Sequence, residues 1–153
     1  WEEADPYFIL TVWIPLTEAT EKNGFLQIIP RVHGIGLLAH HSKAGVGTTI
    51  IDEEIPPQTM LNLPMQKGSV LLIHKETPHR STPNQSDTVR WSMDLRYQKT
   101  GTPTGRPFHP DFVVYSQSNP GSVLDDHEQW RNMWIQALEN SRGVQAHRWS
   151  QKS

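Results

Sequence analysis

A histidine and an arginine on neighbouring stretches of the chain are the residues best suited to chemistry. His79 stands two positions before Ser81, and Arg90 follows His79 by eleven positions. A neutral imidazole is the commonest protein ligand for a divalent metal ion. The planar guanidinium of an arginine binds both oxygens of a carboxylate at once. Together the two groups suggest a site for a metal ion and a small carboxylate ligand.

Several stretches with strand-like composition have to position these groups. Residues 8–16 are rich in β-branched and aromatic side chains that alternate along the chain. Residues 88–97 also alternate, with apolar side chains on one face and Arg90, Ser92, Asp94 and Arg96 on the other. Such a polar face is expected either to meet water or to line a cleft. The other predicted strands are residues 25–30, 59–64 and 69–74.

The connections between these stretches also carry predictions. Asn23-Gly24 is the strongest short turn pattern in the chain, and it predicts that residues 8–16 and 25–30 form a hairpin-like pair. Residues 33–49 are rich in glycine and show little periodicity, so we expect a loop there.

The last part of the chain changes its period. Trp130, Met133, Trp134, Ala137 and Leu138 fall on one stripe of an amphipathic helix. Ser122 or Asp125 is expected to cap this helix and Gly143 to end it. The resulting prediction is a mainly β fold, a sandwich or barrel with a C-terminal helix.

Three segments follow from this pattern. Residues 1–100 are expected to form the larger part of the β core. Residues 101–121 are expected to be an irregular loop with a short strand at 112–115. Residues 122–153 are expected to form the helix and a tail that pack on the core.

Composition limits the classes of function. The 153 residues carry a formal net charge of −2 and no basic run, which argues against an electrostatic nucleic-acid binder. No apolar stretch reaches the roughly 18 residues needed to span a bilayer. The chain has no Cys, so a metal has to be held by His and carboxylate groups, and a cytoplasmic location is expected. The start at Trp1 rather than Met favours an N-terminally incomplete chain.

Two longer segments now show a family pattern. VWIPLTEATEKNGFLQIIPRVH, followed by LPMQKGSVLLIHKETPHRSTPNQSDTVRWSMDLRY, resembles the phytanoyl-CoA dioxygenase family of non-haem Fe(II)/2-oxoglutarate-dependent oxygenases. The resemblance covers roughly residues 7–100. It implies a double-stranded β-helix, or jelly roll, and the use of Fe(II), 2-oxoglutarate and O2. It also implies the hydroxylation of a small-molecule substrate with release of succinate and CO2.

The resemblance assigns roles to five residues. His79 corresponds to a metal ligand of the iron site. Arg90 would pair with the far carboxylate of 2-oxoglutarate, and Ser81 would donate a hydrogen bond to the same region. Trp13, in VWIPL, matches a family residue beside the cosubstrate. His33 stands where the family often has a histidine near the pocket rim, so it is a candidate for substrate contact.

One family feature is missing. Family members carry a His-x-Asp or His-x-Glu before the VWIPL segment, whereas Glu2, Glu3 and Asp5 follow no His. An iron site of this class needs two His and one carboxylate, so the chain by itself is expected to bind iron weakly. Related halogenases replace that carboxylate with a small residue, so a halogenase variant stays open.

Other interpretations also stay open. His74 is expected to be a strand-end histidine, and His40 and His41 are expected to be solvated. Arg90 would otherwise be a surface residue paired with an aspartate, and Trp13 a core residue. The protein would then be an inactive binding or scaffold relative, or a cupin-like isomerase or sugar-binding jelly roll. The expected partner is a small-molecule substrate, without nucleic acid or membrane, and the sequence does not decide the oligomeric state.

Overall fold

The computed structural model describes residues 4–43, 47–106 and 108–144. These residues form two compact units. The first, Phe8–Tyr97, is called the sheet unit here. The second, called the helical unit, contains residues 4–7 and 98–144.

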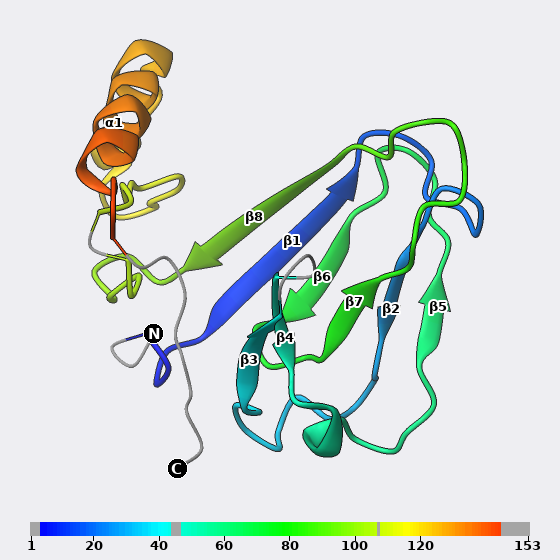
Figure 1. Ribbon diagram of the computed structural model, residues 1–153. Coiled ribbons are helices and arrows are strands. Elements are labelled where there is room, and N and C mark those ends of the chain that lie inside the picture. Colours follow the sequence, from blue (N-terminus) through cyan, green and yellow to red (C-terminus); the bar gives the residue numbers. More distant parts are fainter. Residues whose placement is uncertain (1–3, 44–46, 107, 145–153) are drawn as a thin grey trace. The chain divides into compact units, whose positions relative to one another are not determined.

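The sheet unit contains two three-stranded sheets (Figure 1). One has the order β6-β1-β8 and the other the order β5-β2-β7. The first consists of β1 (Ile9–Pro15), β6 (Leu71–His74) and β8 (Ser92–Gln98), and the second of β2 (Leu26–Ile28), β5 (Leu61–Leu63) and β7 (His79–Ser81). The chain therefore changes sheet between β1 and β2, and again at each step from β5 to β8. This alternation is that of a jelly roll, so the predicted mainly β, double-stranded β-helix fold with a C-terminal helix is confirmed.

A buried cluster joins the two sheets. Trp13 and Ile73 come from the first sheet, and Leu26 and the adjoining Phe25 come from the second. Burying a large apolar side chain contributes about 1.5–3 kcal/mol relative to exposure. The cluster thus holds the inner faces of the two sheets together, which is the basis of any site between them.

The predicted hairpin-like pair is wrong, because β1 and β2 belong to different sheets. Asn23 instead shapes the link that leads from one sheet to the other. Its Oδ1 accepts a hydrogen bond from the Thr20 backbone N–H at 2.8 Å, and its Nδ2 donates to the Glu18 carbonyl at 2.7 Å. The turn predicted at Asn23-Gly24 is therefore present, but it shapes a local loop and does not connect two paired strands.

Residues 33–49 are not wholly a loop as predicted. β3 (His40–Lys43) pairs antiparallel with β4 (Gly47–Ile50). Two hydrogen bonds support the base of this hairpin: Ile51 N–H donates to the Ala39 carbonyl at 3.0 Å, and Ala39 N–H donates to Glu54 Oε2 at 2.6 Å. The paired residues are only 4–10 positions apart, but the two short segments lack the apolar alternation that would have indicated strands. A short 3₁₀ helix, η1 (Asp52–Glu54), follows.

In the helical unit, α1 (His127–Asn140) begins two residues after Asp125, the later of the two predicted caps. Asp126 is the N-cap, and its side chain accepts from the backbone N–H groups of Glu128 and Gln129 at 2.8 and 3.1 Å. The caps proposed at Ser122 and Asp125 are therefore wrong, because Ser122 belongs to the 3₁₀ helix η2 (Pro120–Ser122). None of the helices in the described ranges has the length and hydropathy of a membrane span.

The rest of the helical unit is mostly irregular, as expected. The short strand predicted at 112–115 is reduced to an isolated bridge between Val113 and Val123. Trp134 of α1 contacts the rings of Trp130 and His109, at centroid distances of 6.4 and 5.7 Å. The three-segment division and the packing of helix and tail on the core stay predictions, and residues 145–153 of the tail lie outside the described residues.

Gly24 is a position where only glycine fits. Its φ is +88°, and a Cβ added there would lie 2.6 Å from the Thr82 carbonyl oxygen, just beyond β7. We expect Gly24→Ala to lower the free energy of unfolding by at least about 2 kcal/mol, since left-handed strain adds to a backbone clash. Denaturant titration measures this change. Gly34→Ala is the matched control, because an added Cβ there meets nothing within 4 Å; equal losses in both variants would contradict the argument.

Candidate active site

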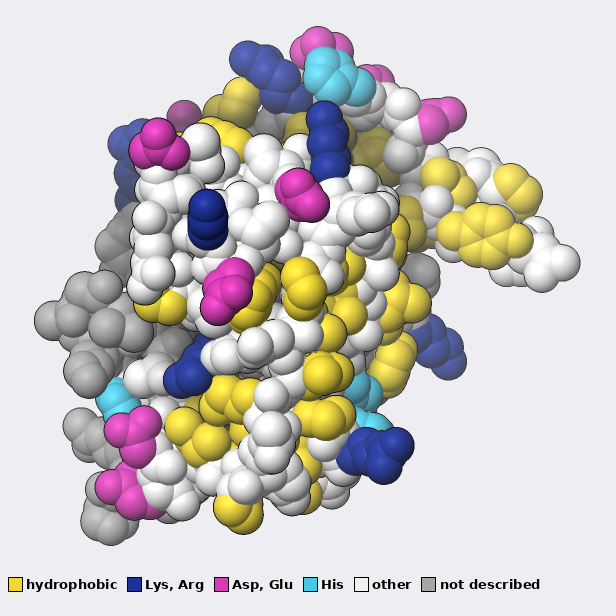
Figure 2. Space-filling view, turned by 90° about the vertical axis from the view of Figure 1, so that its right-hand side faces the viewer, with side chains coloured by type: hydrophobic (Ala, Val, Ile, Leu, Met, Phe, Trp, Pro, Cys, Tyr) yellow, Lys and Arg dark blue, Asp and Glu magenta, His cyan; other side chains and the backbone are white. Residues whose placement is uncertain are grey.

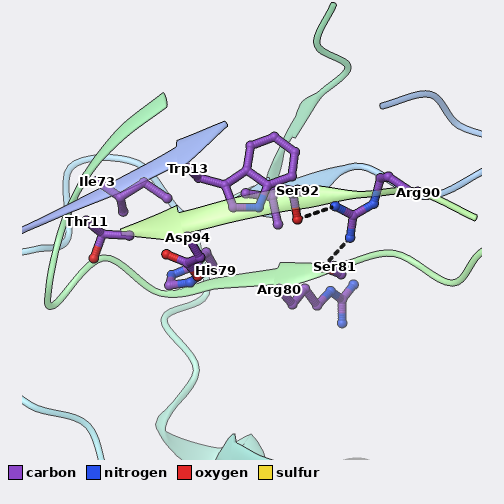
Figure 3. Close-up of a pocket in the computed structure, with 10 residues that line it drawn as sticks. Thr11, Trp13, Ile73, His79, Arg80, Ser81, Arg90, Ser92 and Asp94 are labelled. Carbon is purple, nitrogen blue, oxygen red and sulfur yellow. Dashed lines mark hydrogen bonds between the residues drawn. The ribbon is translucent and has the colours of Figure 1, made fainter. Parts of the chain in front are cut away.

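A cavity of about 350 Å³ lies between the two sheets of the sheet unit (Figure 3). Strands β1, β6 and β8 contribute to one wall, and β2 and β7 to the other. The lining residues are Thr11, Trp13, Leu26, Ile73, His79, Arg80, Ser81, Arg90, Ser92 and Asp94. The structure thus brings together four of the five residues predicted for the site, all except His33.

β7 positions two of these residues. It pairs antiparallel with β2, with His79 opposite Ile28 and Ser81 opposite Leu26. Alternate residues of a strand point to the same face, so His79 and Ser81 both face the cavity. The intervening Arg80 directs its guanidinium elsewhere, and its Nε donates to Gln27 Oε1 at 2.8 Å (Figure 3).

Arg90 is held in place by hydrogen bonds of Trp91, the residue that precedes β8. Leu16 N–H donates to the Trp91 carbonyl at 2.8 Å, and Trp91 N–H donates to Thr17 Oγ1 at 3.0 Å. These bonds tie the chain beside Arg90 to the end of β1. The strand itself begins at Ser92 rather than at residue 88 as predicted, because Asn84 holds the preceding segment in a turn by donating to the Thr88 carbonyl at 2.7 Å.

The Arg90 guanidinium is held on three sides. Nη2 donates to Ser81 Oγ at 3.2 Å, and Nη1 donates to Ser92 Oγ at 3.2 Å (Figure 3). Its Cζ lies 5.4 Å from the centroid of the Trp13 ring, within the range of a cation–π contact. No ion pair involves Arg90 within the part of the chain that the structure describes. A half-buried guanidinium oriented by neutral hydroxyls is suited to a carboxylate ligand.

His79 has the hydrogen bonding of a metal-ligating histidine. Its Nδ1 lies 2.8 Å from the Thr77 carbonyl oxygen. An Nδ1–H that donates to this carbonyl leaves the Nε2 lone pair free, which is the usual arrangement of a ligating imidazole. In residues 4–43, 47–106 and 108–144 no group of three potential metal ligands is present. The described residues therefore do not contain a complete set of metal ligands, and the role of His79 as a metal ligand stays a prediction.

Two other histidines, His33 and His74, lie outside the cavity lining. The His74 ring contacts His33 and Phe8 at centroid distances of 5.3 and 5.6 Å, and its Nδ1 accepts from Glu76 N–H at 3.3 Å. Neither His33 nor His74 lines the cavity. His33 as a substrate contact thus stays a prediction, and the structure places it against another imidazole.

Thr11 and Asp94 were not predicted as site residues. The alternation of residues 88–97 placed Asp94 on the same face as Arg90, so a pattern pointing to it existed. For Thr11 the only indication was its position two residues before Trp13, which places both side chains on one face of β1. The carboxylate of Asp94 forms an ion pair with the Arg96 guanidinium, and Thr11 is buried.

Fold and site together define a jelly-roll protein of the cupin-like kind with a cavity between its sheets. The model of the phytanoyl-CoA dioxygenase (PhyH) family matches residues 1–92, which is more than half of the chain. The chain therefore belongs to the phytanoyl-CoA dioxygenase family.

Individual relatives agree with this assignment. Phytanoyl-CoA dioxygenase domain-containing protein 1 of Danio rerio is 31% identical over 88 residues, which cover 54% of this chain and 30% of the relative. A methylphosphonate hydroxylase of Gimesia maris is 35% identical over 89 residues, covering 58% and 32%. The chain thus matches about a third of the length of these relatives.

A solved structure supports the fold. The non-heme monooxygenase ThoJ in its apo form superposes with a TM-score of 0.59 at 22% identity, over 88% of this chain and 52% of that one. At this level of identity the likeness extends to the fold alone.

Proposed function

We propose that the protein is an Fe(II)/2-oxoglutarate-dependent oxygenase that hydroxylates a small-molecule substrate and releases succinate and CO2. The observation that carries this proposal is the meeting of His79 and Arg90 on one cavity, with the guanidinium held by Ser81 and Ser92. Membership of the phytanoyl-CoA dioxygenase family and similarity to a methylphosphonate hydroxylase support it.

In this proposal each residue has one task. His79 holds iron through Nε2, while Thr77 fixes the orientation of the ring. Arg90 binds the far carboxylate of 2-oxoglutarate, and the Ser81 hydroxyl lies beside that carboxylate. Trp13, only 5% exposed, forms the apolar wall that keeps this end of the cavity dry. When bound, iron supplies the oxidising chemistry that converts 2-oxoglutarate and O2 into succinate and CO2 while one oxygen atom enters a C–H bond of the substrate.

The size and chemistry of the cavity fit this use. Its volume of about 350 Å³ lies at the lower end of the range found for small-molecule sites. The lining combines a few polar groups with the apolar side chains of Trp13, Leu26 and Ile73. A guanidinium whose hydroxyl neighbours hold it in place loses little freedom when a carboxylate binds, which favours affinity.

The test is succinate formation by the full-length protein supplied with Fe(II), O2 and 2-oxoglutarate. We expect succinate that depends on both Fe(II) and 2-oxoglutarate and that disappears when a chelator removes the metal. Bound iron without 2-oxoglutarate binding or succinate would favour an inactive scaffold relative. A chlorinated product in the presence of chloride would identify the halogenase variant.

The proposed partner is a small molecule rather than a nucleic acid or a membrane. On the face seen in Figure 2, Lys and Arg side chains are scattered among Asp and Glu, as the net charge of −2 suggests. A nucleic-acid site would instead gather basic side chains in one patch. A cytoplasmic location stays a prediction.

A further inference from the structure

Arg96 is a second arginine on the side of β8 that carries Arg90. Alternate residues of an extended chain point to the same face, so Arg96 shares the face of Arg90 and Asp94, both of which line the cavity. The Arg96 guanidinium lies against the Asp94 carboxylate: Nη1 donates to Asp94 Oδ1, and Nη2 donates to Asp94 Oδ2 at 3.4 Å. Asp94 is drawn at the end of the cavity away from Arg90 (Figure 3). A second cationic group is therefore held one contact away from that end.

One edge of the Arg96 guanidinium has donors to spare. An arginine side chain has five N–H donors. Nη1 uses its two on Asp94 and on the Leu95 carbonyl, the latter at 3.2 Å, and Nη2 uses one on Asp94. The remaining two, one on Nε and one on Nη2, form the opposite edge of the fork, and the residues that the structure describes offer them no acceptor. An edge of this kind binds both oxygens of a carboxylate.

The spacing of the two guanidinium groups matches a five-carbon dicarboxylate. Arg90 is held beside Ser92, at 3.2 Å from its Oγ, and Arg96 is held beside Asp94. Positions 92 and 94 are about 6.6 Å apart along an extended strand. The terminal oxygens of an extended five-carbon dicarboxylate are about 6–7 Å apart, since its carbon–carbon bonds are about 1.5 Å. A ligand whose far carboxylate is bound by Arg90 therefore brings its near carboxylate level with Asp94 and Arg96.

We propose that Arg96 is a second carboxylate-binding residue of the cosubstrate site, and that Asp94 positions its guanidinium. The inference rests on the proposed function and deepens it, because it gives the near carboxylate of 2-oxoglutarate a protein partner of its own. Asp94 and Arg96 offset each other's charge, so the pair attracts a carboxylate only where that group reaches the open edge of the fork. His79 is drawn at the same end of the cavity (Figure 3), so the carboxylate bound by Arg96 lies on the side of the proposed metal ligand.

The experiment measures ligand binding to the full-length protein by calorimetry, with Fe(II) under anaerobic conditions and again with a chelator in its place. The probes are glutarate, which has a carboxylate at each end, and pentanoate, which has the same length and one carboxylate. In both states we expect Arg96→Ala to weaken glutarate about tenfold and to leave pentanoate unchanged. This loss is smaller than that expected for Arg90, because the Arg96 side chain is 51% exposed and water screens its contact.

Further variants make the result specific. Arg96→Lys keeps the charge without the second edge of the fork, so it should lose part of the glutarate affinity and none of the pentanoate affinity. Arg131→Ala removes an exposed arginine of α1 and should change neither affinity. Arg90→Ala should weaken both probes. Unchanged pentanoate binding also shows that the Arg96 variants are folded.

The two probes separate this inference from the proposed function. Equal losses of glutarate and pentanoate affinity in both Arg96 variants, no loss of either, or a wild type that binds glutarate no more tightly than pentanoate would overturn the inference. Failure of the wild type to bind 2-oxoglutarate, or unchanged binding of both probes in Arg90→Ala, would overturn the proposed cosubstrate site, and the inference with it.

Discussion

Replacing His79 with Gln is expected to abolish high-affinity Fe(II) binding and to lower 2-oxoglutarate turnover by at least about a thousandfold. Removing a group that only supports a metal ligand typically costs 10–100-fold, so removing the ligand itself costs more. A thousandfold loss corresponds to about 4 kcal/mol of transition-state stabilisation. Gln has a similar length and keeps β7 intact, because the strand depends on backbone pairing with β2. Metal content and the rate of succinate formation measure the two effects.

Two other histidines provide matched controls. His74→Gln changes a ring that contacts His33 and Phe8 and does not line the cavity. His41→Gln changes an exposed side chain on β3. Both variants should keep their iron and at least about half of the wild-type rate. Loss of metal in His74→Gln with retention in His79→Gln would transfer the ligand role to His74 and contradict the assignment.

Elements with a strong local pattern were predictable from the sequence. The alternation around Val12 and Trp13 identified β1, and the 3.6-residue stripe through Trp134 and Ala137 identified α1. A short window of sequence records such periods, although β1 is buried on both faces at Thr11, Val12 and Trp13 and α1 buries only Ala137. The observed N-cap of α1, Asp126, differs from the predicted ones because Ser122, Asp125 and Asp126 are all good capping residues. Only the geometry decides among them.

Strand pairing was not predictable in the same way. β1 and β2 look like neighbours because a turn pattern separates them, yet Leu26 pairs with Leu63 and Ser81. β7 is only three residues long and polar, so it has no pattern of its own. Its pairing with β2 depends on contacts more than 50 residues apart, such as the Thr82 hydroxyl that accepts from Phe25 N–H.

The prediction of the site residues rested partly on the family resemblance and partly on the alternation of residues 88–97. From the residues alone, Arg90 would have been paired with Asp87 or Asp94. The structure gives it Ser81 and Ser92 instead and pairs Asp94 with Arg96. Alternation correctly grouped Arg90, Ser92 and Asp94, but it does not say which face of a strand meets the other sheet. Which face meets the other sheet depends on contacts between residues that are distant in sequence, and for this reason Thr11 was not predicted.

Replacing Arg90 with Ala is expected to raise the KM for 2-oxoglutarate about 100-fold, with kcat largely recovered at saturating cosubstrate. Losing one partner of a charge-assisted contact to a carboxylate costs about 3 kcal/mol, within the range for desolvated pairs. The contact holds the far carboxylate in ground state and transition state alike, so its loss acts on KM rather than on kcat. Initial rates of succinate formation across a range of 2-oxoglutarate concentrations measure both constants.

The pattern across substitutions separates cosubstrate binding from a structural role of Arg90. Arg90→Lys keeps the charge but not the fork that reaches both Ser81 and Ser92, so its KM should rise only about tenfold. Arg131→Ala removes an exposed arginine of α1 and should leave KM unchanged. If Arg90 only stabilised the sheets through Trp13, Arg90→Ala would lower the melting temperature and kcat without a rise in KM. A KM equal to that of the wild type would therefore remove the guanidinium from the cosubstrate site.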